Sequence, residues 1–245
     1  IGAMMDKAKA DGQKGVALTD HGNMFGAFKF VSEAKKRDIK PIIGCEFYMV
    51  ENRHRKSFSR AKGEQDVRHH QLLLAKNAKG YENLSKLCSL GFIEGFYSKF
   101  PRIDKELLEK YHEGVIATSC CIGAEIPQAI LHGDKEGAEK KLEWWVELFG
   151  EDFYIELQRH KGLENIDGLG VSQEDVNQEL LRLARKYNLK VIATNDSHYV
   201  DEEDWQPHDI LLCINTGSLL EDEKRFKFPS SDFYFKSQTE MERLF

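Results

Sequence analysis

The stretch Val16-Ala-Leu-Thr-Asp-His-Gly-Asn23 places a short apolar run directly before an acidic residue and a histidine. A short apolar run of this kind is typical of a strand that is buried on both faces of a parallel sheet. Carboxylate and imidazole groups are both common metal ligands. The stretch therefore predicts a buried strand that ends at a candidate metal ligand.

The same order of residues recurs three more times along the chain. In α/β barrels the carboxyl ends of the strands meet on one face, where active sites are built. Side chains that are far apart in the sequence are therefore expected to meet in one pocket. The three further stretches are Pro41-Ile-Ile-Gly44 before Cys45-Glu46, Val115-Ile-Ala-Thr-Ser119 before Cys120-Cys121, and Val191-Ile-Ala-Thr194 before Asn195-Asp-Ser-His198.

Short β-rich runs alternate with amphipathic helices over the whole chain, which predicts a parallel α/β architecture. Helices are expected at 138–149, around Phe28–Ala34, and after Ser172, which forms an approximate capping box with Asp175 and whose helix stops at Asn188. An open doubly wound sheet and a closed barrel both fit, but no Gly-rich phosphate loop opens a helix, and the clustered ligands favour the barrel. The expected strands are Val16–Thr19, Pro41–Val50, Gln71–Ala75, Val115–Ser119, Phe153–Leu157, Val191–Thr194 and Phe233–Phe235.

The composition is that of a globular protein without a membrane span. Of 245 residues, 41% are hydrophobic and 31% charged, and the net charge of −6 argues against a broad basic face that grips DNA. No apolar run reaches the roughly 20 residues that a span needs. The five cysteines are scattered, which favours a reducing cytoplasm over a disulfide framework.

The ligand types at the strand ends favour zinc, manganese or iron over calcium. Asp196 and His198 are two residues apart, so both side chains point the same way in an extended segment. His69 and His70 precede their strand and would lie at the wrong end of a parallel barrel. Either that strand begins earlier or the barrel is distorted.

A basic stretch, Asn52–Lys62, joins two of the expected β-rich runs. It carries five arginines or lysines and one histidine, and it is interpreted as an exposed loop. Two uses of such a loop are compatible with the sequence: a solvated surface and a phosphate contact.

Several segments, in order, are similar to the PHP (polymerase and histidinol phosphatase) domain of bacterial C-family replicative DNA polymerases, the polymerase III alpha subunits. The likeness to this family rather than to small stand-alone PHP phosphatases lies chiefly in Leu72-Leu-Leu-Ala-Lys-Asn77 and Glu156-Leu-Gln158. The matching segments are Val16–Gly26, Ile39–Glu46, His70–Asn77, Gly80–Leu84, Ser119–Pro127, Tyr154–Gln158 and Ala193–Tyr199.

This resemblance implies a distorted seven-stranded TIM-like (β/α) barrel of the PHP type, formed by residues 1–245 as a single domain. It also implies that the first strand, with a His-x-His motif, lies before Ile1 and is missing from this chain. Up to three metal ions are expected, and Asp20 and Glu156 are expected to support the ligands from a second layer. The ligands that the resemblance implies are His21, Glu46, His70, Cys121, Asp196 and His198.

The resemblance further implies that the parent protein performs template-directed DNA synthesis in the cytoplasm with magnesium. Its partners would be DNA, a proofreading exonuclease subunit and other replisome subunits, with no membrane. The domain itself would serve as a scaffold, as a metal-dependent 3′–5′ exonuclease, or as both. The alternative is a stand-alone PHP-type phosphoesterase. Cys120, which has no counterpart as a ligand in the family, is expected in the core together with Cys45 and Cys88.

Overall fold

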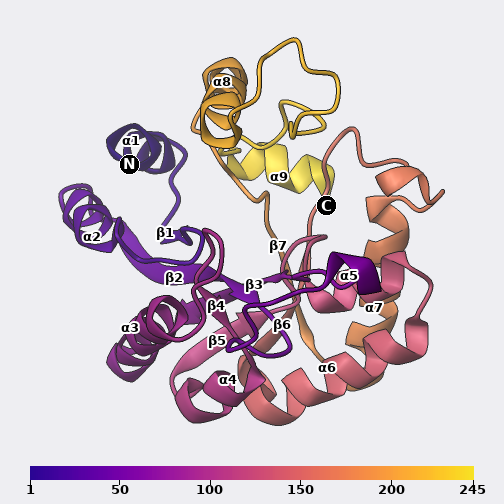
Figure 1. Ribbon diagram of the computed structural model, residues 1–245. Coiled ribbons are helices and arrows are strands. Elements are labelled where there is room, and N and C mark those ends of the chain that lie inside the picture. The colour runs from indigo at the N-terminus through magenta and orange to yellow at the C-terminus, as the bar shows by residue number, and fades with distance from the viewer.

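The computed structural model describes residues 1–245 apart from the side chain of Arg60. Its strands form a single curled, mixed sheet in the order β1-β2-β3-β5-β6-β7, with β4 paired to β2. Figure 1 shows this sheet at the centre of the molecule, with α3, α4, α6 and α7 on its outer side. The strands are β1 (Gly15–Leu18), β2 (Lys40–Met49), β3 (His69–Ala75), β4 (Arg102–Ile103), β5 (Val115–Thr118), β6 (Phe153–Leu157) and β7 (Lys190–Ala193).

Helices connect most of these strands, as the alternating pattern predicts. In α7, Ser172 and Asp175 form the expected capping box, and Asn188 ends the helix in the left-handed conformation with φ 52°. The helices are α1 (Gly2–Ala10), α2 (Ala27–Lys35), α3 (Ala78–Ile93), α4 (Lys105–Tyr111), α5 (Glu125–Leu131), α6 (Lys135–Phe149), α7 (Gln173–Tyr187), α8 (Trp205–Thr216) and α9 (Gln238–Leu244). Among the described residues, no helix has the length and apolar character that crossing a bilayer requires.

The direction of β3 differs from the purely parallel sheet that the alternation predicts. β3 runs antiparallel to both β2 and β5, whereas β1–β2, β5–β6 and β6–β7 are parallel pairs. The amino end of β3 therefore lies at the same rim as the carboxyl ends of its neighbours. The barrel is distorted, and His69 and His70 stand at the ligand-bearing rim rather than at the opposite one.

The expected strand Phe233–Phe235 is wrong. This segment makes only an isolated bridge, Tyr199 to Tyr234, and the seventh strand of the sheet is instead β4, which pairs with the end of β2. β4 has only two residues, which is too short for any periodic signal in the sequence. Among the described strands, β1 and β7 are each paired on one side only, so the barrel is open between them.

A large apolar core fills the space between the sheet and helices α3–α7. Trp145, Phe153 and Leu73 are fully buried within it, and the Trp145 ring packs against that of Phe153 at 6.0 Å. A smaller core joins α1, α2 and β1 through residues such as Met5 and Phe30. Burial of this apolar area is the main favourable term that holds the strand ends in place.

The basic stretch Asn52–Lys62 is only partly the exposed loop that its composition predicts. Arg53 is buried, and its guanidinium donates to Asp104 at 2.8 Å and to Glu94 at 2.7 Å. Arg55 is more exposed and pairs with Glu64. The number of charges in the stretch cannot distinguish the two arginines, because the acidic partners that enclose Arg53 lie 41 and 51 residues away in the sequence.

Replacing Arg53 with Met is expected to lower the free energy of unfolding by about 3–5 kcal/mol, because it leaves the Asp104 carboxylate buried without its charged partner. Urea unfolding of the chain measures this change. The matched control is Arg55→Met, which removes a surface ion pair and should cost no more than about 1 kcal/mol. Equal losses in the two variants would contradict the buried pair.

Candidate metal centre

The candidate ligands that lie far apart in the sequence meet at one rim of the sheet. His21 follows β1 and forms a bridge with Glu46, which stands within β2. His70 is the second residue of β3 and faces Tyr48 on β2 across the antiparallel pair. The other ligands lie in the loops after β5 and β7, where the backbone leaves the sheet.

The carboxylate of Glu46 is the centre of this group. Its Oε1 atom lies 2.7 Å from Nδ1 of His70 and 3.3 Å from Nδ1 of His21. Neither imidazole has the alignment of a hydrogen-bond donor, so this buried oxygen has no hydrogen-bond partner among the described residues. Buried polar atoms without a partner are rare and call for an explanation.

Two further contacts extend the group in opposite directions. Nδ1 of His70 lies 3.4 Å from Sγ of Cys121, and Nε2 of His21 lies 3.4 Å from Nε2 of His198. Atoms that share one tetrahedral zinc-like ion lie roughly 3.3–3.6 Å apart, as metal–ligand bonds of about 2.0–2.3 Å require. Three of the four spacings in the group match this range. The donor atoms are therefore spaced as ligands of a metal ion would be. The two separate pairs, His70 with Cys121 and His21 with His198, leave room for more than one ion.

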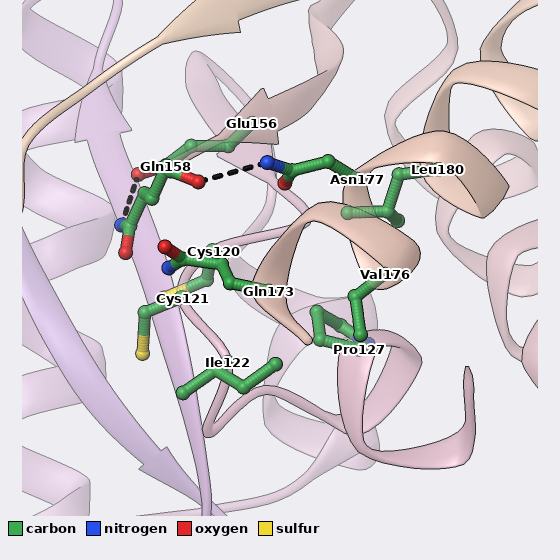
Figure 2. A pocket seen from close by; sticks show the side chains of 10 residues that line it. All are labelled: Cys120, Cys121, Ile122, Pro127, Glu156, Gln158, Gln173, Val176, Asn177 and Leu180. Carbon is green, nitrogen blue, oxygen red and sulfur yellow. Dashed lines mark hydrogen bonds between the residues drawn. The ribbon is translucent and has the colours of Figure 1, made fainter. Parts of the chain in front are cut away.

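The two neighbouring cysteines at the end of β5 both approach Glu46. Glu46, Cys120 and Cys121 each offer a donor atom, and these atoms lie within 4.8 Å of one another. Cys120 adopts a left-handed backbone with φ 59°, and its N–H donates to Thr118 Oγ1. Both side chains line the small cavity in Figure 2, next to Glu156 and Gln158. Cys120 is buried, as expected of a core residue, but its thiol also lies within reach of the ligand group.

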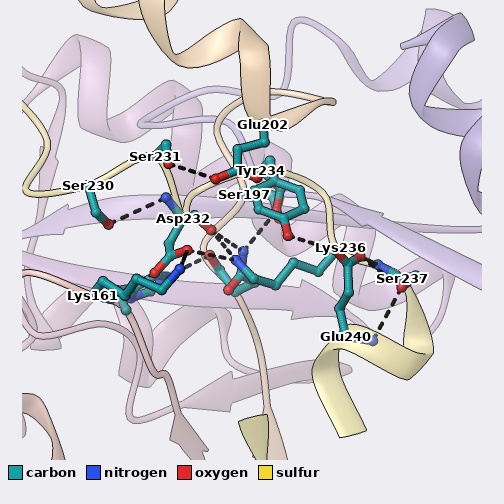
Figure 3. Close-up of polar contacts among 12 residues, drawn as sticks. Lys161, Ser197, Glu202, Ser230, Ser231, Asp232, Tyr234, Lys236, Ser237 and Glu240 are labelled. Carbon is teal, nitrogen blue, oxygen red and sulfur yellow. Dashed lines mark hydrogen bonds and ion pairs between the residues drawn. The ribbon is translucent and has the colours of Figure 1, made fainter. Parts of the chain in front are cut away.

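The loop that carries Asp196 and His198 is held by the last segment of the chain. The His198 N–H donates to Phe233 O, and the Asn195 side-chain amide donates to the carbonyls of both Asp232 and Tyr234. Asp196 adopts φ 46°, and its carbonyl lies 2.7 Å from Nδ1 of His198. Figure 3 shows how the same segment is anchored by other contacts, including Ser231 to Glu202 and Tyr234 to Glu240.

The charges in the group depend on one another. Burial alone would raise the pKa of Glu46, but the two imidazoles lower it to about 2. Burial alone would lower the pKa of His70, but Cys121 and Glu46 raise it to about 10. Burial raises the pKa of Asp196, and the negative charge of Glu46 adds to that rise. Carboxylates, imidazoles and a thiol that shift one another's pKa in this way are typical of functional sites.

The family model of the PHP domain matches residues 1–160 of the chain. The chain belongs to the PHP domain family. Its distorted α/β barrel and the ligand types at one rim agree with this membership.

Comparisons with curated proteins extend the likeness over nearly the whole PHP domain chain. It is 47% identical over 249 residues to the DNA polymerase III subunit alpha of Borreliella burgdorferi, covering 100% of this chain and 20% of that protein. It is 45% identical to the corresponding subunit of Thermus aquaticus, covering 94% of this chain and 18% of the relative. The chain thus spans about a fifth of the length of these relatives.

A solved structure of a candidate metal-dependent phosphoesterase from Bifidobacterium adolescentis is also similar to this PHP domain. It aligns with 14% identity and a TM-score of 0.43, covering 80% of each chain.

The two residues expected behind the ligands occupy different surroundings. Glu156 is buried and accepts hydrogen bonds from Thr118 at 2.6 Å and from Gln158 at 3.0 Å, with Thr194 as a third donor. Asp20 follows β1, and its side chain makes no hydrogen bond to His21 among the described residues, because both nitrogens of that ring face other groups. The supporting role of Asp20 stays a prediction.

The sequence analysis did not predict the side chains that contact the candidate ligands or their buried support, Glu156. Thr118, Thr194 and Gln158 enclose Glu156, and Tyr48 lies against the His21 and His70 rings. Thr118 ends β5 three positions before Cys121, and Thr194 follows β7 two positions before Asp196, which is a weak signal. Tyr48 stands two residues after Glu46 and so on the same face of β2, which the sequence does show.

Replacing Glu156 with Gln is expected to alter the pH dependence of stability. Burial raises the pKa of this carboxyl in the folded state, so wild-type stability should fall as the pH rises above the unfolded value near 4.5. The isosteric amide cannot ionise, so the variant should gain stability relative to wild type between pH 4.5 and neutrality. Urea unfolding in chelator measures this, with exposed Glu151→Gln as control; parallel pH profiles would contradict it.

Proposed function

We propose that this PHP domain binds a multinuclear metal cluster through His21, Glu46, His70, Cys121, Asp196 and His198. The support is that His21 and His70 both approach the orphaned Oε1 of Glu46. Cys121 lies against His70 and His198 against His21, at spacings that suit shared ions, and Asp196 lies beside His198. Mixed imidazole, carboxylate and thiolate donors suit zinc, or manganese or iron, in up to three positions. Glu156 lies behind this group as a buried support.

We infer that the cluster serves hydrolysis of phosphodiesters at DNA 3′ ends. Structural metal sites are closed by protein, whereas catalytic sites keep an open position. The His21 and His70 side chains are 40% and 36% exposed, so one side of the centre is open to solvent. Bound divalent ions lower the pKa of a coordinated water and stabilise charge on the attacking and leaving oxygens.

The protein's own residues supply position and charge in this reaction. Glu46 holds the two histidines close together, and the 195–199 loop holds His198 against His21. The open side formed by His21 and His70 is where a phosphodiester would approach.

The parent protein, by its relatives, is proposed to be a DNA polymerase III alpha subunit that performs template-directed DNA synthesis with magnesium in the cytoplasm. Residues 1–245 form a single PHP domain in this proposal. DNA, a proofreading exonuclease subunit and other replisome subunits are its proposed partners. A stand-alone phosphoesterase is the weaker alternative, because the relatives are about five times longer than this chain.

Replacing Glu46 with Gln is expected to lower metal affinity by at least about 100-fold, since the loss of even an outer-shell partner costs about 10–100-fold. Elemental emission of the purified protein after dialysis measures the bound metal. The control is Glu51→Gln, which changes an exposed glutamate just after the same strand. Equal metal content in both variants would exclude Glu46 as a ligand.

Replacing His198 with Ala in the full-length protein is expected to slow the release of nucleotides from a mismatched primer by at least about 100-fold, again from the cost of weakened metal ligation. His132→Ala, an exposed histidine at the end of α5, is the control. The nuclease proposal fails if nucleotide release is unchanged while the variant binds less metal and its melting temperature falls. In that case the metals only stabilise the fold.

A further inference from the structure

The open side of the metal centre carries aromatic side chains in contact with the candidate ligands. Tyr48 lies opposite His70 in the β2–β3 pair, and its ring is 5.8 Å from His70 and 6.3 Å from His21. The Phe100 ring lies 4.9 Å from that of Tyr48. The Arg68 guanidinium in turn lies 3.9 Å over Phe100. A continuous path of side chains therefore leads from the centre to the surface.

Two cations stand on this path, and we call them the cationic edge: Arg68 and Lys99. Arg68 lies directly before β3, two residues before His70. It shares its one acidic partner, Asp66, with the fully buried Arg102, so two guanidinium groups face one carboxylate. Lys99 is exposed at a tight turn, 5.6 Å from the Phe100 ring. The three cations Arg68, Arg102 and Lys99 thus lie near the single carboxylate of Asp66, although the whole chain carries a net charge of −6.

Three phenylalanines form an exposed aromatic row, Phe25, Phe92 and Phe96, and Phe96 lies three residues before Lys99 of the cationic edge. They are 83%, 40% and 41% exposed, and their rings stack in order at 6.2 and 5.9 Å. Phe25 follows His21 by four residues, so their Cα atoms are at most roughly 14 Å apart. Exposed apolar groups that lie together, unlike scattered ones, mark a binding surface.

We propose that the single-stranded 3′ end of a DNA chain binds this surface, with its bases on the aromatic row and its phosphates at the cationic edge. Aromatic side chains that stack successive bases, next to a basic groove, are the usual way to bind unpaired nucleic acid without sequence preference. Bases within a duplex do not expose their faces to such a row. The surface therefore selects a frayed or mismatched end.

This inference rests on the proposed nuclease function, because a DNA end bound to the row would be a substrate only if the nearby metal centre cleaves DNA. A protein partner is the competing occupant of an apolar surface. The two cations favour DNA, because phosphate contacts dominate the affinity of proteins for nucleic acid. The position of Phe25, four residues from a candidate ligand, favours a substrate over a distant docking partner.

The test uses the full-length protein with His198→Ala, so that binding is read without cleavage. A primer–template with three unpaired 3′ nucleotides carries the photoreactive base 5-iodouracil at the penultimate position. After irradiation, mass spectrometry is expected to find cross-links on peptides that contain Phe25, Phe92 or Phe96. Cross-links found only elsewhere in the polymerase would overturn the proposal.

Variants of the row and of the edge give a quantitative check. The double change Phe25→Ala with Phe92→Ala should reduce the cross-link yield about tenfold or more, because each lost stack weakens binding severalfold. Phe28→Ala is the matched control: Phe28 is 89% exposed but lies outside the row. Arg68→Gln should make the slope of the logarithm of the binding constant against the logarithm of salt concentration shallower by about one, which corresponds to one lost phosphate contact. Arg55→Gln, whose guanidinium also lies over a phenylalanine, is its control.

The outcomes separate this inference from the proposed nuclease. If the expected cross-links form but the wild type releases no nucleotides, the DNA-binding surface is supported and hydrolysis is refuted. Nucleotide release by the wild type, with cross-links unaffected by the double change, would support hydrolysis and overturn the surface. Loss of a replisome subunit from the double variant, with cross-linking intact, would also overturn it and make the row a protein-docking site.

Discussion

The burial of the Glu46 carboxylate is the constraint on which the rest of the site depends. A carboxylate taken out of water costs several kcal/mol unless charged or hydrogen-bonding partners replace the water. Here two imidazoles approach one oxygen without forming aligned hydrogen bonds, and the thiols of Cys120 and Cys121 lie close by. The two imidazoles offset the cost of burying this carboxylate by lowering its pKa to about 2, and cations between these donors would take over that role.

The antiparallel direction of β3 makes this grouping possible. A parallel strand at that place would put His70 at the far end of the barrel from Glu46. Because β3 is reversed, its first residues lie beside the end of β2, and His70 faces Tyr48 in the register. The same reversal brings Arg68 to the open side of the centre. One local change in topology therefore supplies both a candidate ligand and part of the surface beside it.

The opposite side of the centre depends on a segment that has little regular structure of its own. Residues 228–237 hold the Asp196–His198 loop through backbone contacts, such as His198 N–H to Phe233 O and Phe235 N–H to Tyr199 O. The Asn195 side chain adds two more hydrogen bonds to the same segment. Since loops are usually the more mobile parts of a domain, this bracing keeps a ligand-bearing loop in one position.

The sequence by itself determined the strand ends, the capping box of α7 and the residue types at the rim, because these follow from local periodicity and local hydrogen bonding. The family resemblance supplied the ligand set, His70 included. Only the tertiary structure decided how His70 reaches the rim, that Phe233–Phe235 is not a strand, and that Arg53 is buried while Arg55 is not. Each of these depends on partners far away along the chain: the direction of a neighbouring strand, a bridge to Tyr199 and the carboxylate of Asp104. A local pattern fixes what a segment forms, but not which distant segment it meets.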